Sequence, residues 1–87
     1  GPAAKDSVAT LMKLAVEKNV AVRCMAIDAL GNIGPAAKPA WDTLTKLLSD
    51  KAIRPTMGGE GRTTVGDVAK AAMAKIDPNA KPTNTKK

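Results

Sequence analysis

Residues 34–51, GPAAKPAWDTLTKLLSDK, repeat residues 1–18, GPAAKDSVATLMKLAVEK, with ten identities in eighteen positions. The correspondence stops after Lys51 and resumes at an offset of 43 residues, so the second copy contains a ten-residue insertion within 52–64. Within residues 22–33, four positions match at this second offset: Val22 with Val65, Ala26 with Ala69, Ala29 with Ala72, and Ile33 with Ile76. A period of this length is typical of architectures built from stacked helical or strand repeats.

Each copy predicts two helices. Residues 4–17 and 39–50 are amphipathic, because their apolar side chains recur on one side of a 3.6-residue wheel. The inward positions are Val8, Leu11, Met12 and Ala15 in the first copy, and Trp41, Leu44 and Leu48 in the second. Residues 20–33 are apolar or small over most of their surface, which predicts a helix buried on several sides. Residues 64–76 predict the equivalent helix of the second copy. The sequence therefore predicts an all-α fold with four helices.

Local signals set the ends of the second and fourth helices. Gly34 supplies a left-handed stop after the helix at 20–33, and Pro35 prevents its continuation. Thr64 can cap the last helix, with Asp67 three residues later in an approximate capping box. Pro39 suits the first turn of the helix at 39–50, where its missing N–H costs nothing.

These predictions divide the chain into one domain and a tail. The domain spans 1–78, with a first repeat at 1–33 and a second at 34–78. Within the second repeat, residues 54–63 are rich in turn-forming residues and predict a mobile loop. Residues 79–87 have the composition of a flexible basic tail.

The segment VRCMAIDALGNIG, at 22–34, resembles the second helix of a bacterial HEAT-like repeat. That family's pattern is Val-Arg, a pair of small or apolar residues, Ala-Leu-Gly, then an apolar residue and Gly. Residues 35–48 resemble the first helix of the next repeat, and the resemblance covers about residues 1–78. It implies an α-solenoid segment of two helical hairpins, in which neighbouring hairpins share a core.

The resemblance also implies a role and a surface. HEAT-like arrays act as scaffolds, and their second helices line a concave binding side. The candidate partner-binding residues there are Arg23, Ile27, Lys70 and Lys75. In the family, the arginine at position 23 commonly reaches an acid or a carbonyl in the turn. Gly66 stands at the equivalent position of the second repeat, which must therefore be held differently.

The composition excludes several classes of function. The chain has no histidine and a single cysteine, Cys24, which excludes histidine triads, histidine-ligated metals and CxxC-type zinc sites. Trp41 is the only aromatic residue, so binding of single strands by base stacking is excluded. Gly61-Arg62-Thr63 echoes a Walker A motif, but Thr56 and Arg62 depart from its pattern. We expect no enzyme activity, no cofactor and no metal, with Cys24 packing as a small hydrophobe.

The net charge of +6 allows an alternative function. Half of it lies on the tail, in Lys81, Lys86 and Lys87, and the matched lysines Lys13 and Lys46 add two further positions for binding a polyanion. Acids one turn after each matched lysine, Glu17 and Asp50, partly cancel this charge. Nucleic-acid binding by these lysines is therefore expected to be weak and non-specific.

The leading hypothesis is a non-enzymatic protein-interaction or scaffold module. We expect the partner to be another protein or further repeats of a longer array, and a homo-oligomer is also allowed, because two repeats are fewer than the three or so that stability usually needs. A role like that of the HEAT-like phycobilin lyases, which assist chromophore attachment, has no specific residue in its favour. No stretch approaches the ~20 apolar residues of a membrane span, and none resembles a signal peptide. We therefore expect no membrane partner and favour an intracellular location.

Overall fold

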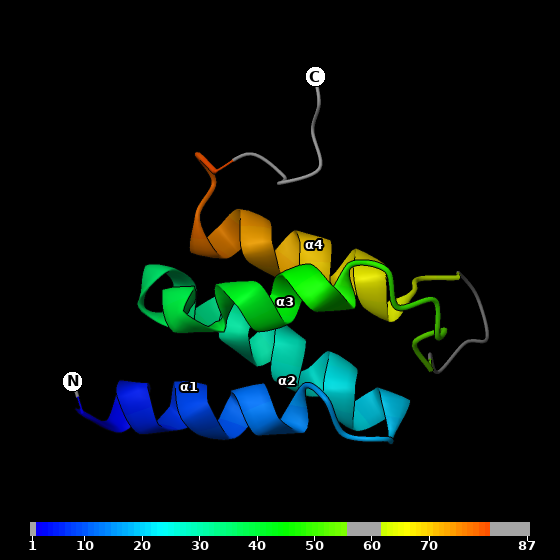
Figure 1. Ribbon diagram of the computed structural model, residues 1–87, viewed down its shortest axis with the longest axis horizontal. Coiled ribbons are helices and arrows are strands. Elements are labelled where there is room, and N and C mark those ends of the chain that lie inside the picture. The colour runs from blue at the N-terminus through cyan, green and yellow to red at the C-terminus, as the bar shows by residue number, and fades with distance from the viewer. Residues whose placement is uncertain (1, 56–61, 81–87) are drawn as a thin grey trace.

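The computed structural model describes residues 2–55 and 62–80, with side chains from Ser7 onward. Its elements are α1 (Pro2–Leu14), α2 (Val20–Ile33), the 3₁₀ helix η1 (Gly34–Ala40), α3 (Trp41–Leu47) and α4 (Val65–Ile76). Figure 1 shows α1 and α4 at opposite sides of the molecule, with α3 between them. The described ranges hold no strand, only a single bridge between Ile53 and Thr64. The all-α prediction is confirmed.

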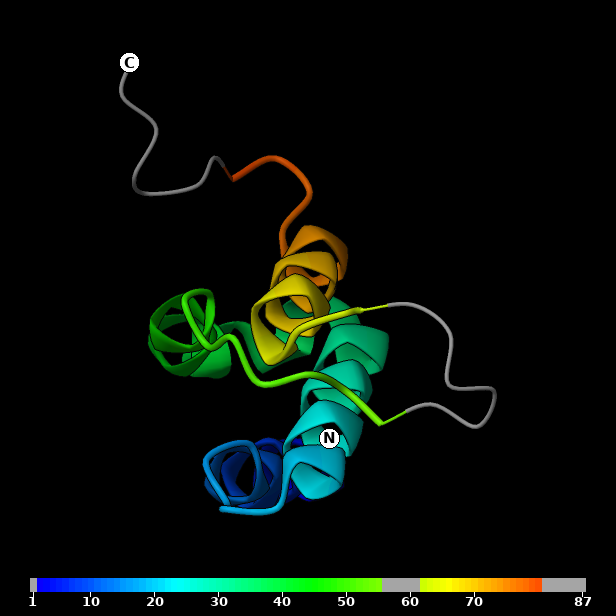
Figure 2. The ribbon, with the colours of Figure 1, turned by 90° about the vertical axis from the view of Figure 1, so that its right-hand side faces the viewer.

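The helices form two layers. Seen end-on in Figure 2, α1 and α3 lie on one side of the molecule, while α2 and α4 lie on the other. The most extensive packing is between α2 and α4, and η1 contacts all four α-helices. The core is continuous through both layers, and its largest fully buried side chains are Ile27, Leu30, Leu44, Val65 and Ile76.

The second and fourth helices have the ends that their sequences predict. Asn19 caps α2, since its side chain accepts a hydrogen bond from the Val22 N–H at 3.1 Å. Gly34 ends this helix with φ of 80° and ψ of −145°, a conformation that is nearly restricted to glycine. In α4 both hydrogen bonds of the capping box are present, between Thr64 and Asp67, each at 3.0 Å.

The first and third helices are shorter than predicted at their carboxyl ends. Helix α1 stops at Leu14, because the N–H groups of Val16 and Glu17 bond in tight turns to the carbonyls of Lys13 and Leu14. The predicted helix 39–50 is an α-helix only over 41–47, and Pro39 lies inside η1 instead of starting it. A proline has no N–H to donate, so two prolines four residues apart interrupt an α-helical ladder there.

The insertion is closed at its base. The N–H of Arg54 donates to the Thr63 carbonyl at 2.7 Å, and that of Val65 donates to the Ala52 carbonyl at 2.8 Å. The two ends of the predicted loop 54–63 are thus joined through their backbones, while residues 56–61 lie outside the described ranges. Of the predicted tail 79–87, residues 81–87 also lie outside them.

Two glycines allow close approach between elements. A Cβ on Gly66 would overlap the carbonyl oxygen of Leu48, and one on Gly31 would lie 2.9 Å from the Cα of Ala72. The Gly66 N–H donates to the Asp50 carbonyl at 2.9 Å. The second repeat is therefore held through the backbone at the position where the first repeat has Arg23.

This geometry predicts that Gly66→Ala destabilises the protein. Helix propensity alone would add about 1 kcal/mol to the free energy of unfolding. The new methyl group meets backbone atoms that cannot rotate away, so we expect a net loss of about 1–3 kcal/mol, as for an overpacked core. Urea denaturation followed by circular dichroism measures it.

The matched control for Gly66→Ala is Ala71→Gly, on an exposed side of the same helix. It should lose only the propensity difference of about 1 kcal/mol. A rise in stability for Gly66→Ala would contradict the close approach seen here.

Candidate functional site

Arg23 is mostly buried and bonded within the fold, which argues against its predicted place on an accessible binding surface. Its side chain is 15% exposed, and its Nη2 lies 3.3 Å from Asp50 Oδ2. Its Nη1 donates to the carbonyls of Glu17 and Lys18 at 2.8 and 3.0 Å. This is the contact with a turn expected of Arg23, and the added bond to Asp50 ties the first repeat to the second. Nε is buried without a hydrogen-bond partner among the described residues.

Ile27 is also wrongly predicted as a surface residue. It is fully buried, because α2 is covered by α1 on one side and by α4 on another. Lys70 and Lys75 are exposed on α4, as predicted, and Nζ of Lys75 donates to Asn32 Oδ1 at 3.3 Å. The surface expected on the second helices is therefore confined to residues of α4 and the exposed side of α2.

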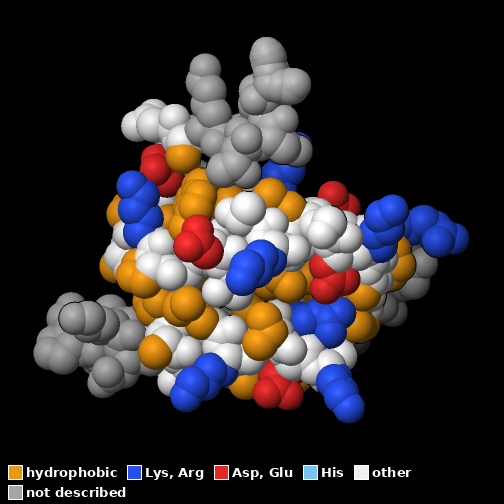
Figure 3. All heavy atoms as spheres, in the orientation of Figure 1, with side chains coloured by type: hydrophobic (Ala, Val, Ile, Leu, Met, Phe, Trp, Pro, Cys, Tyr) orange, Lys and Arg blue, Asp and Glu red, His pale blue; other side chains and the backbone are white. Residues whose placement is uncertain are grey.

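The lysines predicted to bind a polyanion are only partly placed. Lys13 and Lys46 are exposed on α1 and α3, the two helices of one layer. Figure 3 shows basic and acidic side chains interspersed over one face, without a continuous basic row. Lys81, Lys86 and Lys87 lie outside the described residues.

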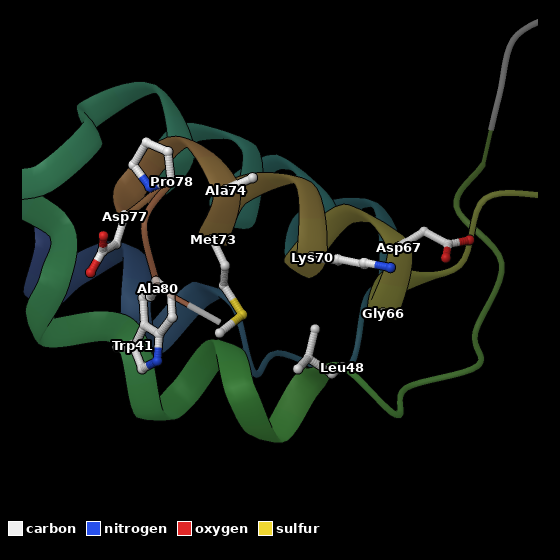
Figure 4. Close-up of a pocket in the computed structure, with 10 residues that line it drawn as sticks. All are labelled: Trp41, Leu48, Gly66, Asp67, Lys70, Met73, Ala74, Asp77, Pro78 and Ala80. Carbon is white, nitrogen blue, oxygen red and sulfur yellow. The ribbon is translucent and has the colours of Figure 1, made fainter. Parts of the chain in front are cut away.

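A groove of about 410 Å³ runs between α3, α4 and the segment after α4. Its apolar lining comes from Trp41, Leu48, Met73 and Ala74, and Figure 4 shows Met73 reaching from α4 towards α3 between Trp41 and Leu48. Asp67 and Lys70 lie at one end, and Asp77, Pro78 and Ala80 at the other. An apolar floor with charged groups at its ends is typical of a surface that binds an apolar side of another molecule.

The acids of the groove already have partners. Asp67 caps α4 through its bond to the Thr64 N–H. Asp77 Oδ2 lies 3.1 Å from Nζ of Lys38, whose hydrogen bond lowers the pKa of that carboxyl below its usual value. Lys70 is therefore the charged side chain of the groove for which no partner is seen among the described residues.

Other side chains of chemical interest are occupied in packing. Cys24 is buried in the core, and burial raises the pKa of its thiol, as expected for a packing residue.

Within residues 2–55 and 62–80, no three cysteine or acidic side chains converge as a metal site would require. None of the helices described is both long and apolar enough to cross a bilayer.

Sequence reasoning did not predict the groove. Trp41 and Leu48 were expected to face inward, which they do in part, since both are half-buried. The sequence does not show which inward positions of the second repeat have no neighbour packed over them.

The chain matches no protein-family model, no curated protein and no solved structure.

The environment of Arg23 predicts that Asp50→Asn destabilises the protein by about 1–3 kcal/mol, the cost of leaving a mostly buried charged group underpaired. Asp28→Asn is the matched control, because Asp28 is exposed and lies 3.9 Å from Arg54. Exposed pairs are worth less than about 1 kcal/mol. Thermal melting of both variants makes the comparison, and equal losses would show that Asp50 has no special role.

Proposed function

We propose that this chain is a non-enzymatic protein-interaction module built from two HEAT-like repeats. The observation that carries the proposal is the register of the two units. Asn32 and Lys75, which are equivalent at the offset of 43 residues, hydrogen-bond to each other across α2 and α4. The first helices share one layer and the second helices the other. Units related in this way stack as in a solenoid, whose extended surfaces bind other proteins.

The exposed lysines of α4 are the charged part of the surface that this proposal offers to a partner. Lys70 lies at the groove, and Lys75 lies beside Asn32 of the first unit. A partner that binds there should present acidic or amide groups to these amines, next to an apolar contact on Met73 and Trp41.

Weak binding of a polyanion is the second candidate. One observation favours it: Asp50, the acid that follows Lys46 by one turn, is engaged by Arg23. It therefore neutralises Lys46 less than its place in the sequence suggests. The matched, exposed Lys13 and Lys46 then remain as the polyanion-binding pair on the described surface.

Two double variants with the same charge change separate the candidates. Lys70→Glu/Lys75→Glu alters α4, and Lys13→Glu/Lys46→Glu alters the other layer. We expect the first to lose proteins that the immobilised wild-type chain retains from a bacterial extract treated with nuclease, and the second to retain them. If neither variant loses any retained protein, the binding side assigned to α4 is wrong.

Duplex DNA binding by fluorescence anisotropy, measured from low to physiological salt, tests the second candidate. Binding carried by the three lysines of 79–87 gives a log–log salt slope of about −3 or shallower, at ~0.9 per phosphate contact. We expect this shallow slope for residues 1–87 and loss of affinity for residues 1–78. A slope of about −5 or steeper that survives the truncation, and is lost in Lys13→Glu/Lys46→Glu, would favour nucleic acid as the partner.

A further inference from the structure

The two repeats differ in which of their sides is covered. Positions of the first repeat that face the second are buried, while the equivalent positions of the second repeat are open. Ile27 is fully buried and Lys70 is exposed, and Gly31 is buried where Ala74 is exposed. Val8 and Ala15 are buried, whereas their equivalents Trp41 and Leu48 are half-buried and line the groove. The groove is therefore the uncovered counterpart of the surface that the second repeat covers on the first.

The opposite side of the first repeat shows the reverse pattern. Met25 is 69% exposed, while its equivalent Val68 is 3% exposed. Leu14 is 36% exposed against 9% for Leu47. Val22 and Ala29 are half-buried, and their equivalents Val65 and Ala72 are buried. We call this open side the front face, defined by Leu14, Val22, Met25 and Ala29. It corresponds to the surface with which the second repeat covers the first.

The chain itself covers one end of the groove. Residues 76–80, IDPNA, repeat residues 33–37, IGPAA, at the same offset of 43. Pro78 and Ala80 line the groove, as equivalents of Pro35 and Ala37 in η1. What remains open lies along Leu48, Lys70 and Ala74, with the buried Met73 beneath them. In the first repeat α4 packs on α2, which carries the equivalents of Lys70 and Ala74, so the open part calls for one helix.

We propose that the groove binds the front face of a second copy of this chain, head to tail, with α2 of one copy in the place that α4 takes in the internal junction. The inference rests on the proposed stacking of repeats and names one partner for it. The chain's own internal junction identifies this occupant, because the front face and the groove correspond to its two sides.

The charges of the two surfaces agree with this arrangement. Inside the chain, a Cβ on Gly31 has Ala72 and Lys75 as its nearest neighbours. We move this pair of contacts back by one helical turn and apply it to the equivalent positions in the junction between copies. Lys70 of one copy then lies beside Met25 and Asp28 of the next copy. Asp28 is exposed, and its carboxylate is 3.9 Å from Arg54. The methylenes of Lys70 can lie on Met25 while the amine reaches Asp28.

The junction between copies must be wider than the internal one. In the internal junction, a Cβ added to Gly31 would lie only 2.9 Å from the backbone of the neighbouring helix. Ala74, which has such a Cβ, takes the place of Gly31 in the junction between copies. Larger side chains are available to fill the wider gap: Trp41 replaces Val8, Leu48 replaces Ala15, and Met25 replaces Val68. With less intimate packing and a lysine at its edge, this contact should form reversibly. Because it uses a different surface on each copy, it leaves one surface of each kind free.

Two single variants and their mixture test the proposal. Met25→Arg blocks the front face and leaves the groove intact, while Ala74→Arg blocks the groove and leaves the front face intact. Both residues are exposed, so both variants should fold, which circular dichroism verifies. In sedimentation velocity over a hundredfold concentration range, we expect the mass of the wild-type chain to rise and each variant to stay monomeric. An equimolar mixture should form a dimer and nothing larger, because it contains one intact surface of each kind.

Other outcomes overturn the proposal. A monomeric wild-type chain at the highest concentration excludes the second copy as occupant. Association of the wild type that one variant abolishes and the other leaves unchanged indicates a symmetric contact through a single surface. A mixture that remains monomeric also rejects the head-to-tail contact. Thr10→Arg, at an exposed position of α1 outside both surfaces, should associate like the wild type. Retention of other proteins through Lys70 and Lys75 is measured separately, so failure of self-association leaves the proposed function intact.

Discussion

The fold depends on the contacts that converge on Asp50. Its Oδ2 pairs with Arg23, its Oδ1 accepts the Ala52 N–H at 3.0 Å, and its carbonyl accepts the Gly66 N–H at 2.9 Å. One residue thus connects α2, the turn after α3 and the first turn of α4. Because Arg23 also binds the turn after α1, both helical connections within the repeats are fixed by a single cluster. A partly buried ion pair adds little net stability, but it penalises any arrangement that separates its members.

Small side chains allow the helices to pack closely, so that this cluster can fix how they are arranged. The chain has no phenylalanine or tyrosine, and 16 of its residues are alanine, so it cannot fill wide gaps between helices. Close packing then requires the helices to approach until backbone meets backbone, as at Gly66 with Leu48 and at Gly31 with Ala72. The alignment of the two repeats is fixed by two sets of contacts. One is the polar cluster at one end, and the other is the set of close glycine contacts along α2 and α4.

Much of the local structure was predictable because its signals are local. The end of α2 follows from the apolar run and Gly34, and the start of α4 follows from the Thr64–Asp67 box. The 3₁₀ segment at 34–40 was not predicted, since Pro39 was expected in the first turn of an α-helix at 39–50. The two copies of GPAAK also differ, because α1 is α-helical from Pro2, whereas Pro39 interrupts the second copy. The relation to HEAT-like repeats stays a prediction.

The candidate site was less predictable, for a physical reason that Ile27 and Lys70 illustrate. Helical periodicity places both at the same position of their repeats, and it cannot tell whether a neighbour covers that position. Ile27 was predicted on the surface and is buried, because the second repeat covers it. Arg23 was predicted to face a partner and also to reach a turn, and only the second role is compatible with its bonds.

The substitutions between the two repeats make the groove and the front face chemically different. Where the first repeat has Cys24 and Ile27, the second has Asp67 and Lys70, so the groove is partly polar at one end. The front face has no such change, since Leu14, Val22 and Met25 remain apolar where nothing described covers them. An apolar front and a half-polar groove are unequal partners, and contact between them is favoured over contact of the groove with itself, which would leave the apolar front exposed to water.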